Sequence, residues 1–142
     1  MIRVLADANV LISAALGRSA RAPSALILEA ALDDKIELLV SAALLAELRS
    51  VLGRPRLRRY LSIETTDRFL IELPDAVELV GDPPPPHLAV CRDPKDDYLI
   101  ALARSAAVDH LVTGDQDLLS AELDDVSVVT PRELVDRLGL DR

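Results

Sequence analysis

Four acidic residues are candidates for a shared site: three stand at the end or beginning of a predicted secondary-structure element, and one lies about two turns into a predicted helix. They are Asp7, Glu47, Asp97 and Asp115. Carboxylates brought together repel one another, by roughly 4 kcal/mol for a pair about 4 Å apart at an effective dielectric near 20. Such a group is therefore kept mainly to bind a hard cation, and oxygen ligands favour Mg²⁺ or Mn²⁺. Ions of this kind can activate a water and stabilise the leaving oxygen when a phosphodiester is hydrolysed.

Three carboxylates lie close together in the stretch CRDPKDDYLIALA, residues 91–103. Asp93 and the following proline are typical of an N-cap and the first position of a helix. Asp96 then falls at the third helical position, where a negative charge is favoured by the helix dipole. Helical periodicity leaves both Asp96 and Asp97 possible as the residue that contributes to a metal site.

Each acid also has a purely structural interpretation. Asp7 and Asp115 could simply cap helices, and Glu47 could be a solvated residue on a helix surface. The case for a site depends on convergence, because ligands of open α/β sheets bind beyond the carboxyl ends of the strands. Asp7 and Asp115 follow predicted strands directly, and the other two acids lie on helices next to that edge.

Short apolar runs alternate with helical patterns along the whole chain. The predicted strands are 2–6, 36–40, 76–80, 110–113 and 126–130. A predicted helix begins soon after Asp7, and further helices cover 24–34, 41–53, 65–73, 94–107, 115–123 and 131–139. This alternation indicates an α/β fold, a three-layer α/β/α sandwich with a mainly parallel central sheet. The proline run within 81–87 is predicted to be a surface connection inside one domain covering 1–142.

Composition excludes several other classes of function. The chain has 142 residues, a net charge of −8 and only three aromatic residues, which argues against generic DNA binding and against base stacking on an aromatic platform. Metal-binding carboxylates, by contrast, are neutralised by the ions they hold. Cys91 is alone, so neither an intrachain disulfide nor a CxxC zinc site can form. With no signal peptide or membrane span in sight, we expect a soluble cytoplasmic protein.

Several stretches resemble the motifs of PIN-domain ribonucleases, particularly VapC-like toxins of bacterial toxin–antitoxin pairs. They are DANVLIS (7–13), the helix around Glu47, CRDPKDDYLIALA (91–103) and LVTGDQDLL (111–119). The resemblance implies a PIN-like sandwich with a Mg²⁺ or Mn²⁺ site that cleaves single-stranded RNA. It also implies a homodimer and a cognate antitoxin protein as partners.

Carried over by position, the resemblance implies a set of metal ligands. These are Asp7, Glu47, Asp97 and Asp115, with Asp97 chosen because it stands three residues before Ile100 in a D-x-x-I-A pattern. Supporting polar positions are Asn9, Thr113, Asp117 and Asp96. No side chain is expected to act as a nucleophile. Guanidinium groups match phosphate geometry, so the candidate RNA contacts are Arg18, Arg21, Arg49 and Arg54, although a solvated surface explains arginines equally well.

Other functions remain open from the sequence. A PIN nuclease could process RNA without any antitoxin. A doubly wound phosphoacceptor or phosphatase would want a second acid close to Asp7 and a lysine after the strand 126–130; Asn9 occupies the first place, and the second is missing. A catalytically silent binding module is disfavoured because all four acids are present.

Overall fold

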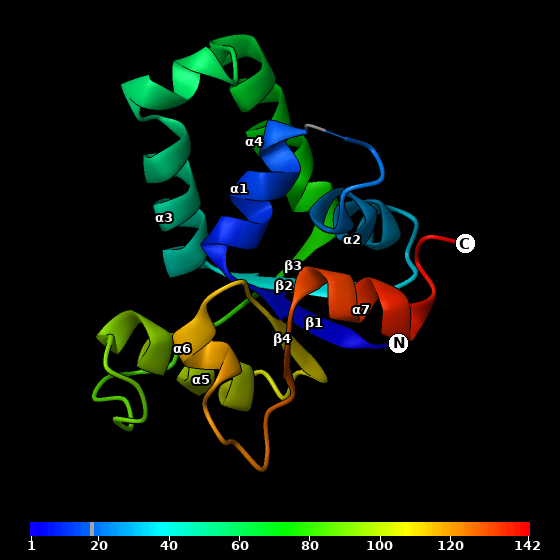
Figure 1. The fold of residues 1–142 in the computed structure, drawn as a ribbon. Helices are drawn as coiled ribbons and strands as arrows, with labels where there is room; N and C mark the ends of the chain where they lie inside the picture. Colours follow the sequence, from blue (N-terminus) through cyan, green and yellow to red (C-terminus); the bar gives the residue numbers. More distant parts are fainter. Residues whose placement is uncertain (18) are drawn as a thin grey trace.

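A parallel five-stranded sheet forms the centre of the computed structural model, which describes residues 1–17 and 19–142 (Figure 1). The strand order is β3-β2-β1-β4-β5, and every neighbouring pair is parallel. The strands are β1 (Arg3–Ala6), β2 (Glu37–Ser41), β3 (Val77–Val80), β4 (His110–Val112) and β5 (Val128–Val129). The predicted parallel sheet is thereby confirmed, although β5 is shorter than the predicted 126–130.

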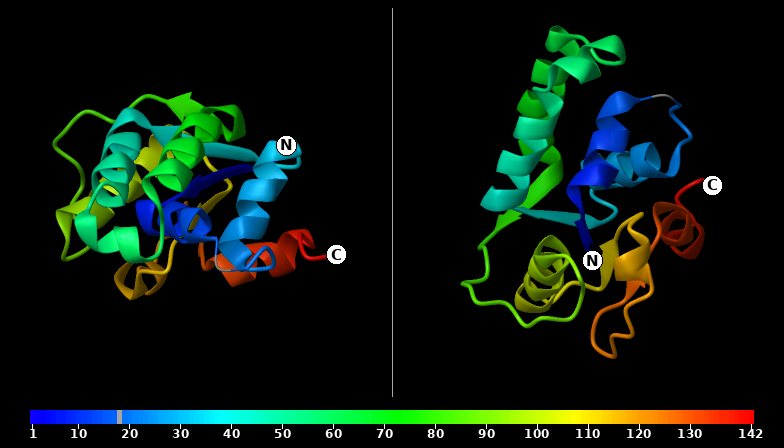
Figure 2. Two further views of the ribbon diagram at one scale, coloured as in Figure 1. Left: turned by 90° about the horizontal axis from the view of Figure 1, so that it is seen from above. Right: turned by 60° about the vertical axis from the view of Figure 1, so that its left-hand side comes forward.

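Helices cover both faces of the sheet and complete the predicted three layers (Figures 1 and 2). The helices are α1 (Ala8–Leu16), α2 (Pro23–Leu32), α3 (Ala42–Leu52), α4 (Ile63–Ala76), α5 (Pro94–Ser105), α6 (Gln116–Leu119) and α7 (Pro131–Leu138), with a 3₁₀ helix η1 (Pro55–Arg59). Helices α5 and α6 lie on one face, and the other helices lie on the opposite face. The strands are brief apolar runs because both of their faces are buried.

Successive residues of β1 point into the two different cores. Val4 and Ala6 belong to the larger core under α1, α2, α4 and α7, whereas Leu5 packs with residues of α5 and α6. All three are fully buried. β1 is the central strand, with Leu5 paired to Leu39 of β2 and to Leu111 of β4. The segment that follows β1 therefore lies between the carboxyl ends of both neighbours.

Helix boundaries differ from the predicted ones in places. α4 begins before and ends after the predicted 65–73, and it continues through Pro74, which lies in the last turn and removes only one backbone donor. α6 covers only Gln116–Leu119 of the predicted 115–123. The predicted cap and stop of α3 are confirmed: Ser41 Oγ accepts from the Leu44 amide at 3.2 Å, and Gly53 follows the last turn.

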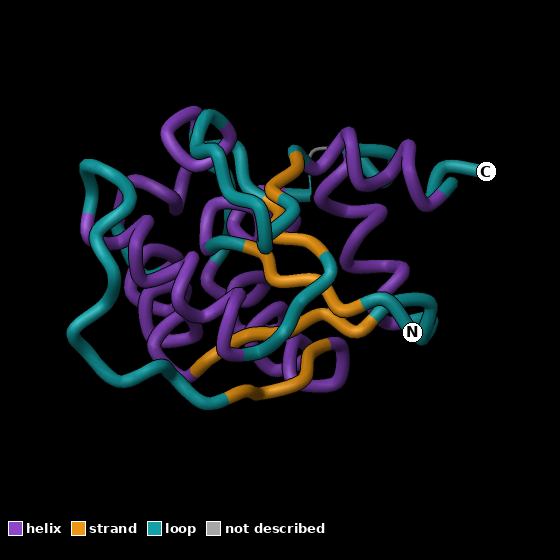
Figure 3. The backbone as a smooth tube through the Cα atoms, turned by 90° about the horizontal axis from the view of Figure 1, so that it is seen from below, coloured by secondary structure: helices purple, strands orange, loops and turns teal. Residues whose placement is uncertain are grey.

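The proline-containing connection between β3 and α5, residues 81–93, has no helix or strand and runs along the surface, as Figure 3 shows. It is nevertheless attached at both ends. Near its start, Asp82 Oδ2 accepts from the Ala43 amide at 3.2 Å. Near its end, the amides of Val90 and Cys91 donate to Asp97. Within the described ranges 1–17 and 19–142, no helix has the length and apolar character needed to cross a membrane.

Candidate metal centre

Asp7 lies at the carboxyl end of β1 and caps α1. Its Oδ1 accepts from the Val10 amide at 3.0 Å, and its Oδ2 accepts from the hydroxyl of Thr113. Its own amide donates to the carbonyl of Val112 at 3.1 Å, which ties it to the end of β4. Burial raises the pKa of Asp7 above the usual range, although the bonds from Thr113 and Val10 act in the opposite direction. Asp7 therefore caps α1 and at the same time lies at the edge of the sheet where the candidate site is.

Asp115 follows β4 and lies across the same edge from Asp7. Its backbone amide donates to Thr113 Oγ1 at 3.0 Å, while its Oδ1 accepts from the Asp117 amide at 2.8 Å and so caps α6. Thr113 is fully buried and serves both acids, since the same hydroxyl oxygen donates to Asp7 and accepts from Asp115. Thr113, which was predicted as a supporting polar position, thus contacts both Asp7 and Asp115.

Asp96 lies close to both Asp115 and Asp117. One carboxylate oxygen from each of Asp96, Asp115 and Asp117 lies within 4.8 Å of the others. Asp96 is 4% exposed, and its buried Oδ2 finds no hydrogen-bond partner among the described residues. Burial, together with the charge and close approach of Asp115, raises the pKa of Asp96 to about 6. A buried carboxylate that has an oxygen without a donor and lies close to two other carboxylates fits the ligand environment of a cation.

The carboxylate of Asp97, one of the predicted ligands, is hydrogen-bonded to the backbone of the loop 81–93. Its Oδ1 accepts from the amides of Val90 and Cys91 at 2.8 and 2.7 Å, and these bonds lower its pKa. It does not line the cavity that the other acids share. Asp96 stands three residues before Leu99 and shares its face of α5, and Leu99 lines this cavity as well.

Glu47 and Asn9 face the same cavity of about 780 Å³, which Asp7, Asp96 and Asp115 also line. Both are exposed. Glu47 lies on α3, in the second turn after Ser41, and Asn9 lies in the first turn of α1. The structure thus brings three of the four predicted ligands to one cavity, with Asp96 in the place expected for Asp97.

Tyr98 is a cavity residue that was not singled out from the sequence. Its hydroxyl is 2.6 Å from Ser41 Oγ and donates to Asp82 Oδ1 of the loop 81–93. Burial and the adjacent Asp82 carboxylate raise the pKa of Tyr98 to about 12. His87 packs edge-on against its ring, with centroids 5.6 Å apart. Tyr98 could have been suspected because it is an aromatic residue next to the acidic turn in a chain that has few.

Basic residues rim part of this acidic cavity. Arg54, Arg56 and Lys95 line it, whereas Arg49 does not. The guanidinium of Arg21 donates instead to the carbonyl of Asp141 at 3.0 Å, away from the acids. Arg18 lies outside the described residues. The structure therefore places one of the four arginines predicted to contact RNA, Arg54, beside the candidate site.

Comparisons with known proteins agree with this arrangement. A family model described as "PIN domain" matches residues 3–117. A curated relative, the uncharacterized protein MJ1680 of Methanocaldococcus jannaschii, is 29% identical over 95% of this chain and 90% of its own length. The crystal structure of PAE2754 from Pyrobaculum aerophilum superimposes with a TM-score of 0.62 at 19% identity, covering 97% of this chain and 90% of that one. PIN domains are usually nucleases that depend on divalent metal ions.

Proposed function

The chain belongs to the PIN domain family, and on this basis we propose that it is a Mg²⁺- or Mn²⁺-dependent endoribonuclease that hydrolyses phosphodiester bonds in single-stranded RNA. We further propose that it acts as the toxin of a toxin–antitoxin pair. The observation that carries the nuclease proposal is the buried carboxylate of Asp96, whose Oδ2 has no hydrogen-bond partner among the described residues and which lies close to Asp115 and Asp117. Leaving such an oxygen without a donor or a cation is costly, so its retention supports a ligand role.

The proposed ligands are Asp96, Asp115 and Asp117, which lie close to one another. Asp96 and Asp115 line the acidic cavity together with Asp7 and Glu47. Asp97 is replaced by Asp96 in this set because its carboxylate is already engaged by two backbone amides. A divalent cation bound there would supply an activated water and stabilise the leaving oxygen of the cleaved bond. The chain itself fixes the positions of Asp7 and Asp115 through Thr113, and Arg54, Arg56 and Lys95 provide positive charge for the phosphates of the strand.

Protein partners are the second part of the proposal. Ile63 and Ile71 of α4 and Leu79 of the edge strand β3 are each at least 60% exposed. Exposed large apolar side chains are the kind of surface that a second copy of the chain or an antitoxin would cover. Expression in cells distinguishes the toxin role from a housekeeping role in RNA processing. If the chain is a toxin, its expression alone arrests growth, and coexpression of the antitoxin relieves the arrest.

The test of the metal site compares thermal unfolding with EDTA and with saturating Mn²⁺. Filling a specific site to a hundred times its dissociation constant adds about 2.7 kcal/mol, a rise of about 5–10 °C for a chain of this size. The wild type and Asp67→Asn, a change at an exposed position on α4, should both show this rise. Asp96→Asn should not. Equal rises in all three proteins would refute the assignment of Asp96.

The test of activity uses labelled single-stranded RNA, duplex RNA and single-stranded DNA with the same proteins. We expect cleavage of the single-stranded RNA by the wild type and by Asp67→Asn, only when Mn²⁺ or Mg²⁺ is present. Asp96→Asn and Asp7→Asn should be inactive. Undiminished cleavage by both of these variants, or cleavage in EDTA, would show that the proposed centre does not perform the reaction.

A further inference from the structure

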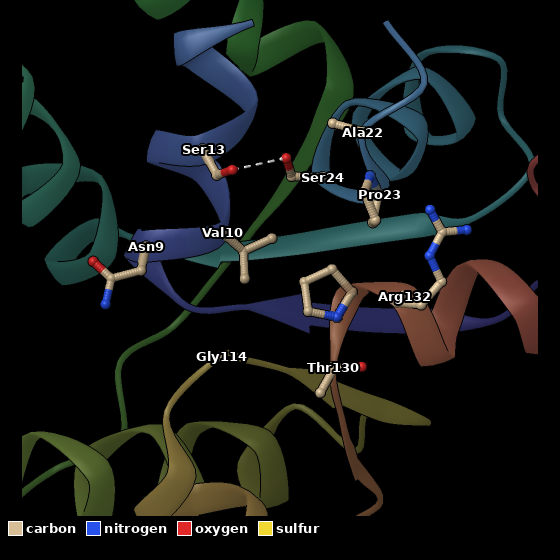
Figure 4. Close-up of a pocket in the computed structure, with 10 residues that line it drawn as sticks. Asn9, Val10, Ser13, Ala22, Pro23, Ser24, Gly114, Thr130 and Arg132 are labelled. Carbon is tan, nitrogen blue, oxygen red and sulfur yellow. Dashed lines mark hydrogen bonds between the residues drawn. The ribbon is translucent and has the colours of Figure 1, made fainter. Parts of the chain in front are cut away.

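A second cavity, of about 380 Å³, lies between α1, α2 and the start of α7 (Figure 4). Its volume is at the small end of the ~300–1,000 Å³ typical of pockets for small organic groups. Val10, Ala22 and Pro23 give it apolar walls. Ser13 Oγ accepts from the hydroxyl of Ser24 at 3.1 Å on one side, and Arg132 lies on the other. The cavity therefore combines a mainly apolar lining with a few polar groups at defined positions.

This cavity adjoins the candidate metal centre. Asn9 lines both cavities, and in Figure 4 it lies at the end directed toward α3. Gly114, another lining residue, stands between Thr113 and Asp115, which belong to the acidic site. A group bound in the second cavity would therefore lie beside a group held at the acids, as neighbouring nucleotides of one strand do.

The polar groups suit the edge of a nucleobase. Each serine hydroxyl offers one donor and two acceptor lone pairs, so the Ser13–Ser24 pair keeps hydrogen-bonding capacity after bonding to itself. The guanidinium of Arg132 is half exposed, and its carboxylate neighbours Asp136 and Asp141 are both 3.7 Å away. It can therefore reach a phosphate at the mouth while the base occupies the apolar part.

We propose that this cavity binds the base of one nucleotide adjacent to the cleaved phosphodiester and so sets the sequence preference of the enzyme. This inference rests on the proposed function, because it takes the acidic cavity as the site of cleavage. The apolar walls favour a base over a bare phosphate, and the shared Asn9 favours a unit of the same strand over a separate ligand.

The first experiment measures binding of the four nucleoside 5′-monophosphates to the metal-free protein by amide NMR shifts. We expect the amides of Val10, Ser13 and Gly114 to move with one nucleotide more than with the others. Gly114→Val should weaken this binding by about tenfold. A side chain at Gly114 meets no atom within 4 Å and its φ is ordinary, so the variant should fold; Gly81→Val, at an equally open glycine, is the matched control. Arg132→Gln should also weaken binding, whereas Arg137→Gln on the same helix should not.

The second experiment sequences the cleavage positions in a pool of randomised single-stranded RNA. The wild type and Gly81→Val should prefer one base at a position flanking the cut, and Gly114→Val should lose this preference while keeping the Mn²⁺-dependent rise in melting temperature. An unchanged preference in Gly114→Val overturns the proposal, even if mononucleotides bind. Absence of nucleotide shifts at these amides overturns it as well. If the protein binds nucleotides in this cavity but cleaves no RNA, the proposed function is refuted, whereas nucleotide binding in the cavity is not.

Discussion

The hydroxyl of Thr113 donates a hydrogen bond to Oδ2 of Asp7, although 106 positions separate the two residues in the sequence. The same hydroxyl oxygen accepts from the amide of Asp115 at 3.0 Å. One buried side chain thus connects the carboxyl ends of β1 and β4 and fixes the positions of two candidate ligands. A charge-assisted bond of this kind is stronger than one between neutral groups.

Replacing Thr113 by valine keeps the shape of the side chain and removes both bonds. We expect Thr113→Val to lower the free energy of unfolding by about 1–3 kcal/mol, because a buried carboxylate oxygen loses its donor. Thr113→Ser keeps the hydroxyl and should lose less. Thr65→Val, at an exposed position on α4, should change stability by only about 0.5 kcal/mol or less. Urea unfolding measures all four proteins, and equal stability of Thr113→Val and the wild type would contradict the role of the hydroxyl.

The raised pKa of Asp96 predicts how stability depends on pH in the metal-free protein. An acid whose pKa rises from 3.8 unfolded to about 6 folded binds its proton more tightly in the folded state. Its contribution to stability is therefore fully present below about pH 4 and is lost as the pH rises through about 6. Asp96→Asn removes this loss, since its amide can donate to Asp115. We expect the variant to melt above the wild type at pH 7.5 in EDTA.

The difference between the two melting temperatures should shrink as the pH falls from 7.5 to 4.5. Comparing the variant with the wild type at each pH separates Asp96 from other carboxyls, such as Asp82 and Asp125, whose pKa values are lowered. Asp67→Asn again serves as the control. A melting difference that stays constant over this pH range would show that Asp96 does not titrate there.

Asp97 should behave in the opposite sense, because the amides of Val90 and Cys91 lower its pKa. Its contribution to stability is present above its unfolded pKa of 3.8 and is lost as the pH falls through the lower folded value. Asp97→Asn keeps an acceptor but loses the charge, so we expect it to destabilise the protein at pH 7.

Amide hydrogen exchange distinguishes Asp97 from its neighbour. Exchange at Val90 and Cys91 should accelerate in Asp97→Asn and stay slow in Asp96→Asn, since only Asp97 receives these amides. If exchange accelerates equally in both variants, the position of the loop 81–93 depends on the first turn of α5 in general and not on the carboxylate of Asp97.

The contrast between Asp96 and Asp97 marks the limit of what the sequence could predict. Alternation of apolar runs and helical patterns predicted the sheet and its layers, because burial on both faces leaves a clear pattern. The strand ends then located Asp7 and Asp115. Adjacent residues on a helix point about 100° apart, so only one of the two acids can face the cavity. The choice depends on how the helix is rotated and on which acid binds the amides of the loop 81–93, and local sequence shows neither.

The hydrogen-bond partners of Tyr98 and Thr113 could not be predicted from the sequence either. Thr113 was expected only as a polar position in the pocket, because its two bonds join segments that pair only in the folded sheet. Tyr98 connects Ser41 with Asp82 across three elements, and no spacing rule relates these residues. Such long-range polar contacts are consequences of the topology, and their partners can be named only after the strand order is known.

The last prediction concerns the basic rim of the acidic cavity. Each phosphate contact to a single strand contributes a slope of about 0.7 to the fall of log affinity with log salt concentration. Replacing Arg54 and Arg56 together by glutamine should therefore reduce the slope by about 1.4 if both contact phosphates. Arg49→Gln with Arg59→Gln removes the same charge from exposed positions that do not line the cavity. This matched double variant should leave the slope nearly unchanged.

Fluorescence anisotropy of a labelled single-stranded RNA in EDTA, where cleavage is suppressed, gives these slopes between 50 and about 300 mM salt. Each double variant removes two positive charges from a chain whose net charge is −8, so both variants have the same net charge. A general electrostatic effect would therefore lower both slopes equally. That result would mean that RNA binding depends on the overall charge of the protein and not on particular arginines. A loss confined to the first variant would place the strand along Arg54 and Arg56, beside the carboxylates at the ends of β1 and β4.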